Sequence, residues 1–492
     1  MFLVRGEILL LLITIISVKV FCQPVFDYNQ KCKTVYTDVL KLKIPYAQKV
    51  IQEEKLKEPD NFAWLLLQSY CDFLYIFINE DYKAFEQLEQ DFDKRLELID
   101  QLDNNNPWKK FAKAEMYIHK ATARAKFEEF FTTVWEIRKA NKLLQENNRL
   151  FPDFKPNQKS LSIFNAVFGT IPDKYKFGAR LLGFKGNVAE GMQQIEDYLV
   201  YAKEQNMFYD EMLLLHNFFL IYLDKDFENA YQIASTQLKP KESLLHNFIA
   251  AEIAYKTGRI EEAIEVVENH PKNKDYMPYP FMDYYLGIFK MTQLNTSEAI
   301  PLITSFLTKF KGRHYIKEAW YRLALCHLIE KDTLSYFRCL KNVETTGYQL
   351  YDADRQSYAN SVSGEMPNTK LLKARLLNDG GYYNKSLAIL MQMDTPGVKY
   401  KDNLERLYRL GRVYEALNET EKALQYYKKV VDFAHNDKYY FGGRACLQLG
   451  NMYKRLKEFE LADTYYKMTF RYNKHPYKDS FEQQAKAGIS NH

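Results

Sequence analysis

Two stretches near the carboxyl end share one internal spacing, which constrains the fold more than any other feature. In the first, Leu410 and Gly411 precede Tyr414, and Ala423 precedes Tyr427 by four residues. The same order recurs 39 residues later, at Leu449, Gly450, Tyr453, Ala462 and Tyr466. Small residues let a neighbouring helix approach, and the rings fill the space beside them, because protein interiors are close-packed. The pattern predicts two successive pairs of antiparallel helices.

Weaker copies of the pattern lie upstream, with anchors at Glu252, Gly287, Ala324, Ala374, Gly411 and Gly450. Successive anchors are 35, 37, 50, 37 and 39 residues apart. The long step predicts an insertion between about Gly347 and Pro367, where Ser, Asn, Gly and Asp cluster as they do in loops. We expect about six divergent units between residues 240 and 475.

The spacing resembles the tetratricopeptide signature, Leu-Gly-x₂-Tyr followed by Ala-x₃-Phe, in which each unit of about 34 residues is a helical hairpin. The resemblance implies an all-α, TPR-like solenoid over residues 206–492, with a groove that holds a protein or peptide partner. First helices of the repeats line such grooves. The positions usually facing the groove are occupied here by Tyr408, Arg412, Glu415, Asn451, Lys454 and Arg455. Each could equally be an ordinary solvated residue.

Composition also favours long helices. The chain has 492 residues, 47% of them hydrophobic, which is ample for a large core. It contains only 19 Gly and 15 Pro, well below their combined share of roughly 12% in average proteins. No sustained alternation of apolar and polar residues predicts a strand.

The first 22 residues have the layout of a secretory signal. Arg5 supplies a positive charge, and an apolar run from Ile8 to Val18 follows it. The run is too short for a comfortable membrane span. We expect cleavage after about Cys22, which makes the protein exported, either periplasmic or associated with the cell envelope. Lipid modification of Cys22 and an uncleaved anchor are the alternatives.

Removal of the signal leaves five cysteines: Cys32, Cys71, Cys326, Cys339 and Cys446. An odd number spread this thinly is not a disulfide framework. We expect the last three to be reduced core residues, although Cys326 and Cys339 could meet across one repeat. A Cys32–Cys71 pair near the amino end is conceivable.

Residues 23–205 form a second predicted domain, helical but without clear repeat phase. Helices are expected over Trp64–Asp72, Tyr82–Leu102 and much of Trp108–Phe151. Short motifs within residues 108–200 resemble a divergent TPR family that includes eukaryotic inclusion-body clearance proteins. These motifs are the helix around Trp135, the turn Gly169–Pro172 and the stretch Leu181–Asn187. That family implies no catalytic residues, and the export signal departs from its intracellular setting.

The segment 160–190 is unlike a standard repeat. One interpretation makes Gly183, Gly186 and Gly191 a tight corner between helices. The other is a lipid or partner pocket lined by aromatic rings. Those rings are Phe164, Phe168, Phe177 and Phe184.

The sequence contains no recognisable catalytic motif. The nine His residues never form H-x-x-x-H or H-E-x-x-H, and no C-x₂-C pair exists, so no metal site is predicted. Phosphate-binding and nucleophile-elbow motifs are also missing, so no catalytic residue or cofactor is expected. Basic and acidic residues are interleaved, which argues against nucleic acid as a partner.

The sequence therefore predicts a non-enzymatic exported scaffold for protein–protein interaction. The alternative is a membrane-associated envelope assembly or lipid-handling protein that uses residues 160–190 for peripheral membrane contact. An enzyme with a site in residues 23–205 has no motif to support it.

Overall fold

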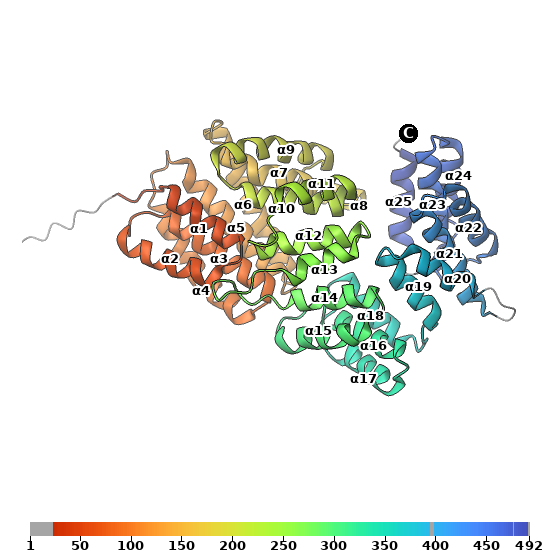
Figure 1. The fold of residues 1–492 in the computed structure, drawn as a ribbon. Coiled ribbons are helices and arrows are strands. Elements are labelled where there is room, and N and C mark those ends of the chain that lie inside the picture. Colours follow the sequence, from red (N-terminus) through yellow and green to blue (C-terminus); the bar gives the residue numbers. More distant parts are fainter. Residues whose placement is uncertain (1–22, 394–397, 476, 491–492) are drawn as a thin grey trace, which may run out of the picture.

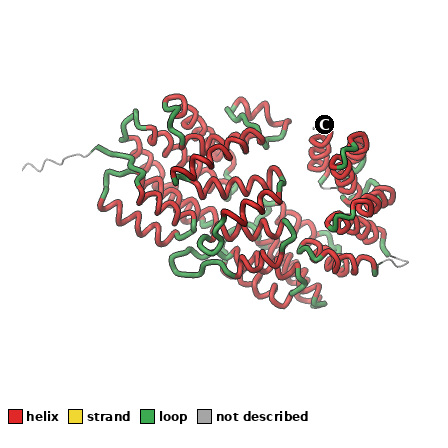
Figure 2. Tube along the Cα trace, turned by 45° about the horizontal axis from the view of Figure 1, so that its top comes forward, coloured by secondary structure: helices red, strands yellow, loops and turns green. Residues whose placement is uncertain are grey.

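The computed structural model describes residues 23–393, 398–475 and 477–490. Within these residues the chain is helical throughout, and the only strand-like feature is an isolated bridge between Val25 and Asn61 (Figures 1 and 2). The predicted all-α class is confirmed. The predicted export signal and Cys22 lie outside the described residues.

The amino-terminal helices pack into the layered body at the red-to-olive end of Figure 1. They are α1 (Gln30–Leu40), α2 (Ile44–Lys57), α3 (Ala63–Asn79), α4 (Tyr82–Asp100), α5 (Pro107–Ala125), α6 (Phe130–Leu150), α7 (Pro156–Gly169), α8 (Asp173–Leu181), α9 (Val188–Gln205), α10 (Tyr209–Phe219), the π-helical turn η1 (Leu220–Asp224) and α11 (Phe227–Gln237). Asn and Asp side chains cap several of these helices, among them Asn29 at α1, Asp81 at α4 and Asn106 at α5.

Six helical hairpins follow. They pair α12 (Leu244–Lys256) with α13 (Ile260–Glu268), α14 (Phe281–Thr292) with α15 (Thr296–Lys309), α16 (Ile316–Ile329) with α17 (Thr333–Thr345), α19 (Thr369–Asp379) with α20 (Tyr383–Met391), α21 (Tyr400–Ala416) with α22 (Thr420–Phe433), and α23 (Phe441–Arg455) with α24 (Phe459–Thr469). A last helix, α25 (Lys478–Ser490), packs on α23 and α24.

All six hairpins turn through one residue in the left-handed region. These residues are Gly258, Leu294, Lys331, Gly381, Asn418 and Lys457. A left-handed residue ends a helix and lets the chain reverse within a few residues. Only two of the six are glycine, so four turns hold a side chain in a region that costs an L-residue roughly 1 kcal/mol. Packing of the two helices outweighs that cost.

Glycine in the first helix makes room for a large side chain sixteen residues later. A Cβ atom at Gly411 would lie 2.6 Å from two ring carbons of Tyr427, and one at Gly450 would lie 2.5 Å from the ring of Tyr466. Gly287 bears the same relation to Ile303, at 2.8 Å. The packing predicted from the motif is therefore present.

The insertion expected as a loop between Gly347 and Pro367 is in fact mostly helix. Residues Asp352–Val362 form α18, which packs against α16 and α17. The Asp354 carboxylate, fully buried, accepts the backbone N–H groups of Tyr315 and Glu318 at 2.7 and 3.0 Å. It thereby caps α16, whose own N-cap position offers no side-chain acceptor. Composition suggested a loop for residues 347–367. Packing against α16 and α17, including the Asp354 contact, instead stabilises α18 as a helix.

Two hydrophobic cores meet at α19. The first extends from Phe26 to Leu376, so the amino-terminal helices and the first three hairpins share it. The second extends from Leu371 to Ala485 and includes the last three hairpins and α25. The array also bends back on itself, because a Cβ at Gly381 would lie 2.1 Å from the carbonyl oxygen of Gly258. The turns of the first and fourth hairpins are thus in backbone contact.

The five cysteines of the described residues are free and buried. Cys32 and Cys71 are not paired, and neither are Cys326 and Cys339. Burial raises the pKa of the Cys32 and Cys326 thiols to about 12, so both remain protonated and unreactive at neutral pH.

Candidate functional site

The predicted groove positions lie on α21 and α23, the first helices of two adjacent hairpins. These helices contact each other, and α23 in turn contacts α25. Gln448, Asn451 and Arg455 lie on one side of α23, because their spacings of three and four residues match a helical turn. Together with Glu415 of α21, which Gln448 and Arg455 contact, they form one polar face.

Glu415 is the polar centre of this face. Its carboxylate accepts hydrogen bonds from the Tyr427 hydroxyl at 2.7 Å and from Arg455 at 2.7 Å, and Gln448 approaches at 3.4 Å. Two of the predicted residues, Glu415 and Arg455, are thus joined across the two helices. Arg455 remains 61% exposed, so its guanidinium has open donors for a partner.

Tyr408 differs from the prediction. It is 5% exposed and packs against Tyr427 and Phe441 in the second core, so it does not line a surface. The close packing of α23, through Phe441, covers its ring. Arg412 is half-buried beside it. Burial alone would lower the pKa of Arg412, but interactions with Tyr408, Tyr427 and Glu415 raise it above its ordinary value.

The other two predicted residues are more accessible. Asn451 is exposed and its side-chain oxygen accepts a hydrogen bond from the Tyr466 hydroxyl at 2.8 Å. Lys454 is half-buried near the end of α23. The open polar groups on this face are therefore those of Asn451, Lys454 and Arg455.

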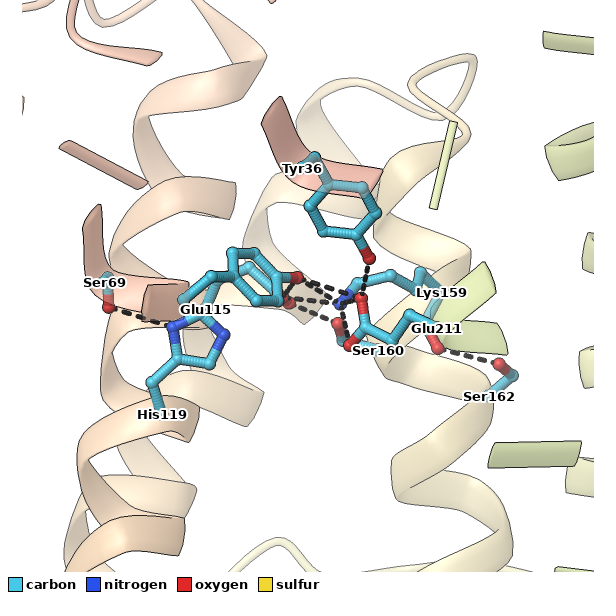
Figure 3. Close-up of polar contacts among 9 residues, drawn as sticks. Tyr36, Ser69, Glu115, His119, Lys159, Ser160, Ser162 and Glu211 are labelled. Carbon is cyan, nitrogen blue, oxygen red and sulfur yellow. Dashed lines mark hydrogen bonds and ion pairs between the residues drawn. The ribbon is translucent and has the colours of Figure 1, made fainter. Parts of the chain in front are cut away.

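A buried polar cluster joins the amino-terminal helices α1, α3, α5, α7 and α10 (Figure 3). The ammonium group of Lys159 lies 2.6 Å from Glu115, 2.9 Å from Glu211 and 2.9 Å from the Tyr70 hydroxyl. Tyr36 donates to Glu211 at 2.5 Å, and Ser160 donates to Glu115.

Electrostatics explain why this cluster is stable in the protein interior. Burial alone would lower the pKa of Lys159, but the charges of Glu115 and Glu211 raise it above its ordinary value. Burial, together with the Lys159 charge, lowers the pKa of neighbouring His119 to about 3. His119 is therefore neutral at pH 7, and its Nδ1 lies 2.9 Å from the Ser69 hydroxyl.

The side chains of Lys159 and Glu115 are 2% and 1% exposed, so a substrate in solution does not reach them. The cluster fixes how five helices pack. The sequence did not predict this cluster, because partners such as Lys159 and Glu211 are far apart in the chain. One local signal was present: Glu115 and His119 share a face of α5 with the buried Phe111 and Ala112.

The 160–190 segment contains both a tight corner and a pocket. Gly186 and Gly191 form the tight corner, since Cβ atoms there would lie 2.3 Å from backbone atoms of Asn165 and Ala166. Gly183 has no such neighbour. A pocket of about 320 Å³ lies beside this corner, lined by Phe168, Ile171, Lys176, Ala179, Arg180, Phe184, Lys185 and Gly186.

Two of the four predicted rings therefore line the pocket. Phe164 instead packs beneath Phe168, and Phe177 extends into solvent, 77% exposed. A second, smaller pocket lies between α9, α10 and α11, near His216 and Glu196.

Among the described residues, no group of three or more His, Cys, Asp or Glu side chains is arranged to hold a metal ion. In the same part of the chain, every helix is too short or too polar to cross a bilayer.

Stacked hairpins with a repeated turn and a repeated small-to-large contact define a helical-repeat protein. The tetratricopeptide-repeat family matches residues 404–436 and 443–467, which cover α21 to α24. These two matched segments are therefore tetratricopeptide repeats.

No curated protein sequence matches the chain. Among solved structures, it is similar to the TPR domain of P58(IPK), with 14% identity over 84% of this chain and 96% of that one, at a TM-score of 0.21.

Proposed function

We propose that this protein is an exported, non-catalytic scaffold whose carboxyl-terminal repeats bind a protein or peptide partner. One observation supports this most directly: α21 and α23 contact each other and share a polar face, on which Asn451, Lys454 and Arg455 offer open polar groups. Tetratricopeptide arrays commonly present such extended surfaces to partners.

The chemistry of the face favours a polar, partly acidic segment. Arg455 has donors beyond those that pair with Glu415, and Lys454 adds a second cation within one turn of it. Arg412, on the neighbouring helix α21, adds a third positive charge. A carboxylate-bearing peptide would complement this surface.

The experiment compares binding by two pairs of variants. A partner is first recovered from the native envelope with the tagged chain, and its binding is then measured directly. Lys454→Glu and Arg412→Glu should weaken binding by about tenfold or more. Lys422→Glu and Lys429→Glu on α22, the second helix of the hairpin, are the matched controls. Equal binding by both pairs, with helicity unchanged, would remove the assignment of this face.

Export is a separate part of the proposal, supported by the layout of the first 22 residues. Mass spectrometry of the protein from envelope fractions should find a chain that begins at about Gln23. A lipid-modified Cys22 would mean a tethered protein, and an intact Met1 in the cytoplasm would contradict export.

The alternative, a membrane-associated assembly or lipid-handling protein, is supported by the exposed apolar side chains of α8. Flotation of the chain with vesicles tests it independently of the repeat face.

A further inference from the structure

Helix α8 is an excursion between two helices that are already in contact. A Cβ at Gly169, the last residue of α7, would lie 2.5 Å from the backbone nitrogen of Val188, the first residue of α9. The chain could therefore pass from α7 to α9 directly. It instead adds residues 170–187, of which Ile171 and Phe184, near the two ends, pack against the first core.

The excursion contacts the rest of the molecule mainly at its ends. Arg138 donates to the carbonyl oxygen of Leu182 at 3.2 Å, and Asn141 donates to that of Gly183 at 3.2 Å. Midway along α8, a Cβ at Gly178 would meet no atom within 4 Å. Phe177 and Leu181 are 77% and 70% exposed. Isolated exposed apolar residues are common, but two of this size on a nine-residue helix need a further reason.

The pocket under α8 has two chemically distinct parts. Phe168, Ile171 and Phe184 form an apolar floor, in which the rings of Phe168 and Phe184 lie 4.7 Å apart. Lys176, Arg180 and Lys185 lie around this floor. Among the described residues, Arg180 and Lys185 form no ion pair with a carboxylate of the protein, and both are exposed. Their charges are thus available to a ligand.

We propose that this pocket binds an anionic amphiphile, whose chain lies against the apolar floor and whose acidic group is held by Arg180 and Lys185. The volume, about 320 Å³, lies at the lower end of the range for small-molecule sites and suits a single medium-length chain. The exposed Phe177 and Leu181 extend the apolar surface past the pocket. This proposal stands apart from partner binding by the repeats, because the pocket adjoins the first core and the repeat face belongs to the second.

A series of ligands that differ only in the head group tests the proposal. The chain without its first 22 residues retains every described element and is titrated with a dansyl-labelled fatty acid. Laurate should displace the probe, whereas dodecanol and dodecylammonium should do so at least about tenfold less well, because only the acid pairs with both cations.

Two kinds of variant locate the site. Arg180→Glu with Lys185→Glu should weaken laurate binding by about tenfold or more, and the matched pair Lys272→Glu with Lys274→Glu, exposed elsewhere, should leave it unchanged. Ala179→Phe should fill the pocket and block binding while the thermal midpoint holds. An absence of head-group preference, or equal binding by both charge-reversed pairs, would overturn the proposal.

Flotation with vesicles distinguishes a free acid from a bilayer lipid as the source. Binding of laurate in solution without flotation supports a free acid. Flotation with phosphatidylglycerol vesicles that depends on Arg180 and Lys185 supports a lipid of the bilayer. Failure of both laurate and vesicle binding overturns the site and leaves partner binding by the repeats untouched.

Discussion

Glu80, at the end of α3, accepts a hydrogen bond at 2.9 Å from the ring of His314, which lies 234 residues later at the start of the third hairpin. The same carboxylate accepts the backbone N–H groups of Arg313 and His314 at 2.6 and 3.0 Å, and Lys126 pairs with it at 3.3 Å. Burial would raise the pKa of Glu80, but the bond from His314 and the charge of Lys126 hold it below its ordinary value. This carboxylate fastens the amino-terminal helices to the repeat array.

Glu80→Ala should therefore loosen that junction. The substitution leaves two backbone donors and the Lys126 ammonium without their acceptor in a buried place, which costs about 3 kcal/mol of unfolding free energy. Urea denaturation measures the loss, and limited proteolysis should show faster cleavage near Arg313. Glu86→Ala, exposed on α4, is the control. Identical stability in the two variants would show that Glu80 does not hold the junction.

Gly411→Ala and Gly450→Ala should destabilise the second core. Each new methyl group would lie within about 2.6 Å of a tyrosine ring, and overpacking of this kind costs about 1–3 kcal/mol. The matched control is Gly178→Ala on α8, where the methyl meets nothing and helix propensity gains about 0.5–1 kcal/mol. Calorimetry should show opposite shifts of the thermal midpoint. A shift of the same sign for all three would refute the packing argument.

Lys159→Met should destabilise the first core, because Glu115 and Glu211 would be left buried without their cation. The expected loss is about 4 kcal/mol of unfolding free energy at pH 7. Urea titrations at pH 7 measure this loss, with Lys49→Met, 76% exposed, as control. Equal losses in the two variants would contradict the assignment.

Asp354 should give the chain a measurable pH dependence. Burial raises its pKa to about 6, against 3.8 for the ordinary side chain, although the N–H groups of Glu318 and Tyr315 lower it. Because the folded value is the higher one, the folded state binds the proton more strongly. The ionised carboxyl thus costs stability above pH 6, and this cost disappears as pH falls toward about 4.

Asp354→Asn removes that titration. As pH falls from 7.5 to 5, the thermal midpoint of the natural chain should rise relative to that of the variant. Asp352→Asn, whose side chain is 94% exposed in the natural chain, should show no such trend. A difference that stays constant with pH for Asp354→Asn would mean that its carboxyl titrates normally.

The sequence by itself determined the hairpins. Gly411, Ala423 and Tyr427 have a fixed spacing because they meet within one pair of helices, so their packing is a local property that one chain segment encodes. The same holds for the turn at Asn418. Contacts within one hairpin recur at the same spacing in each repeat, so the sequence pattern predicts them.

Only the tertiary structure decided which distant residues pair. Lys159 with Glu211, Glu80 with His314, and Asp354 with the start of α16 each join elements whose spacing follows no repeat. It also decided that residues 352–362 are helical and that Tyr408 is buried, since both depend on helices packed against them. Contacts of this kind depend on where the solenoid bends, and the bend is the sum of many packing contacts that no single motif contains.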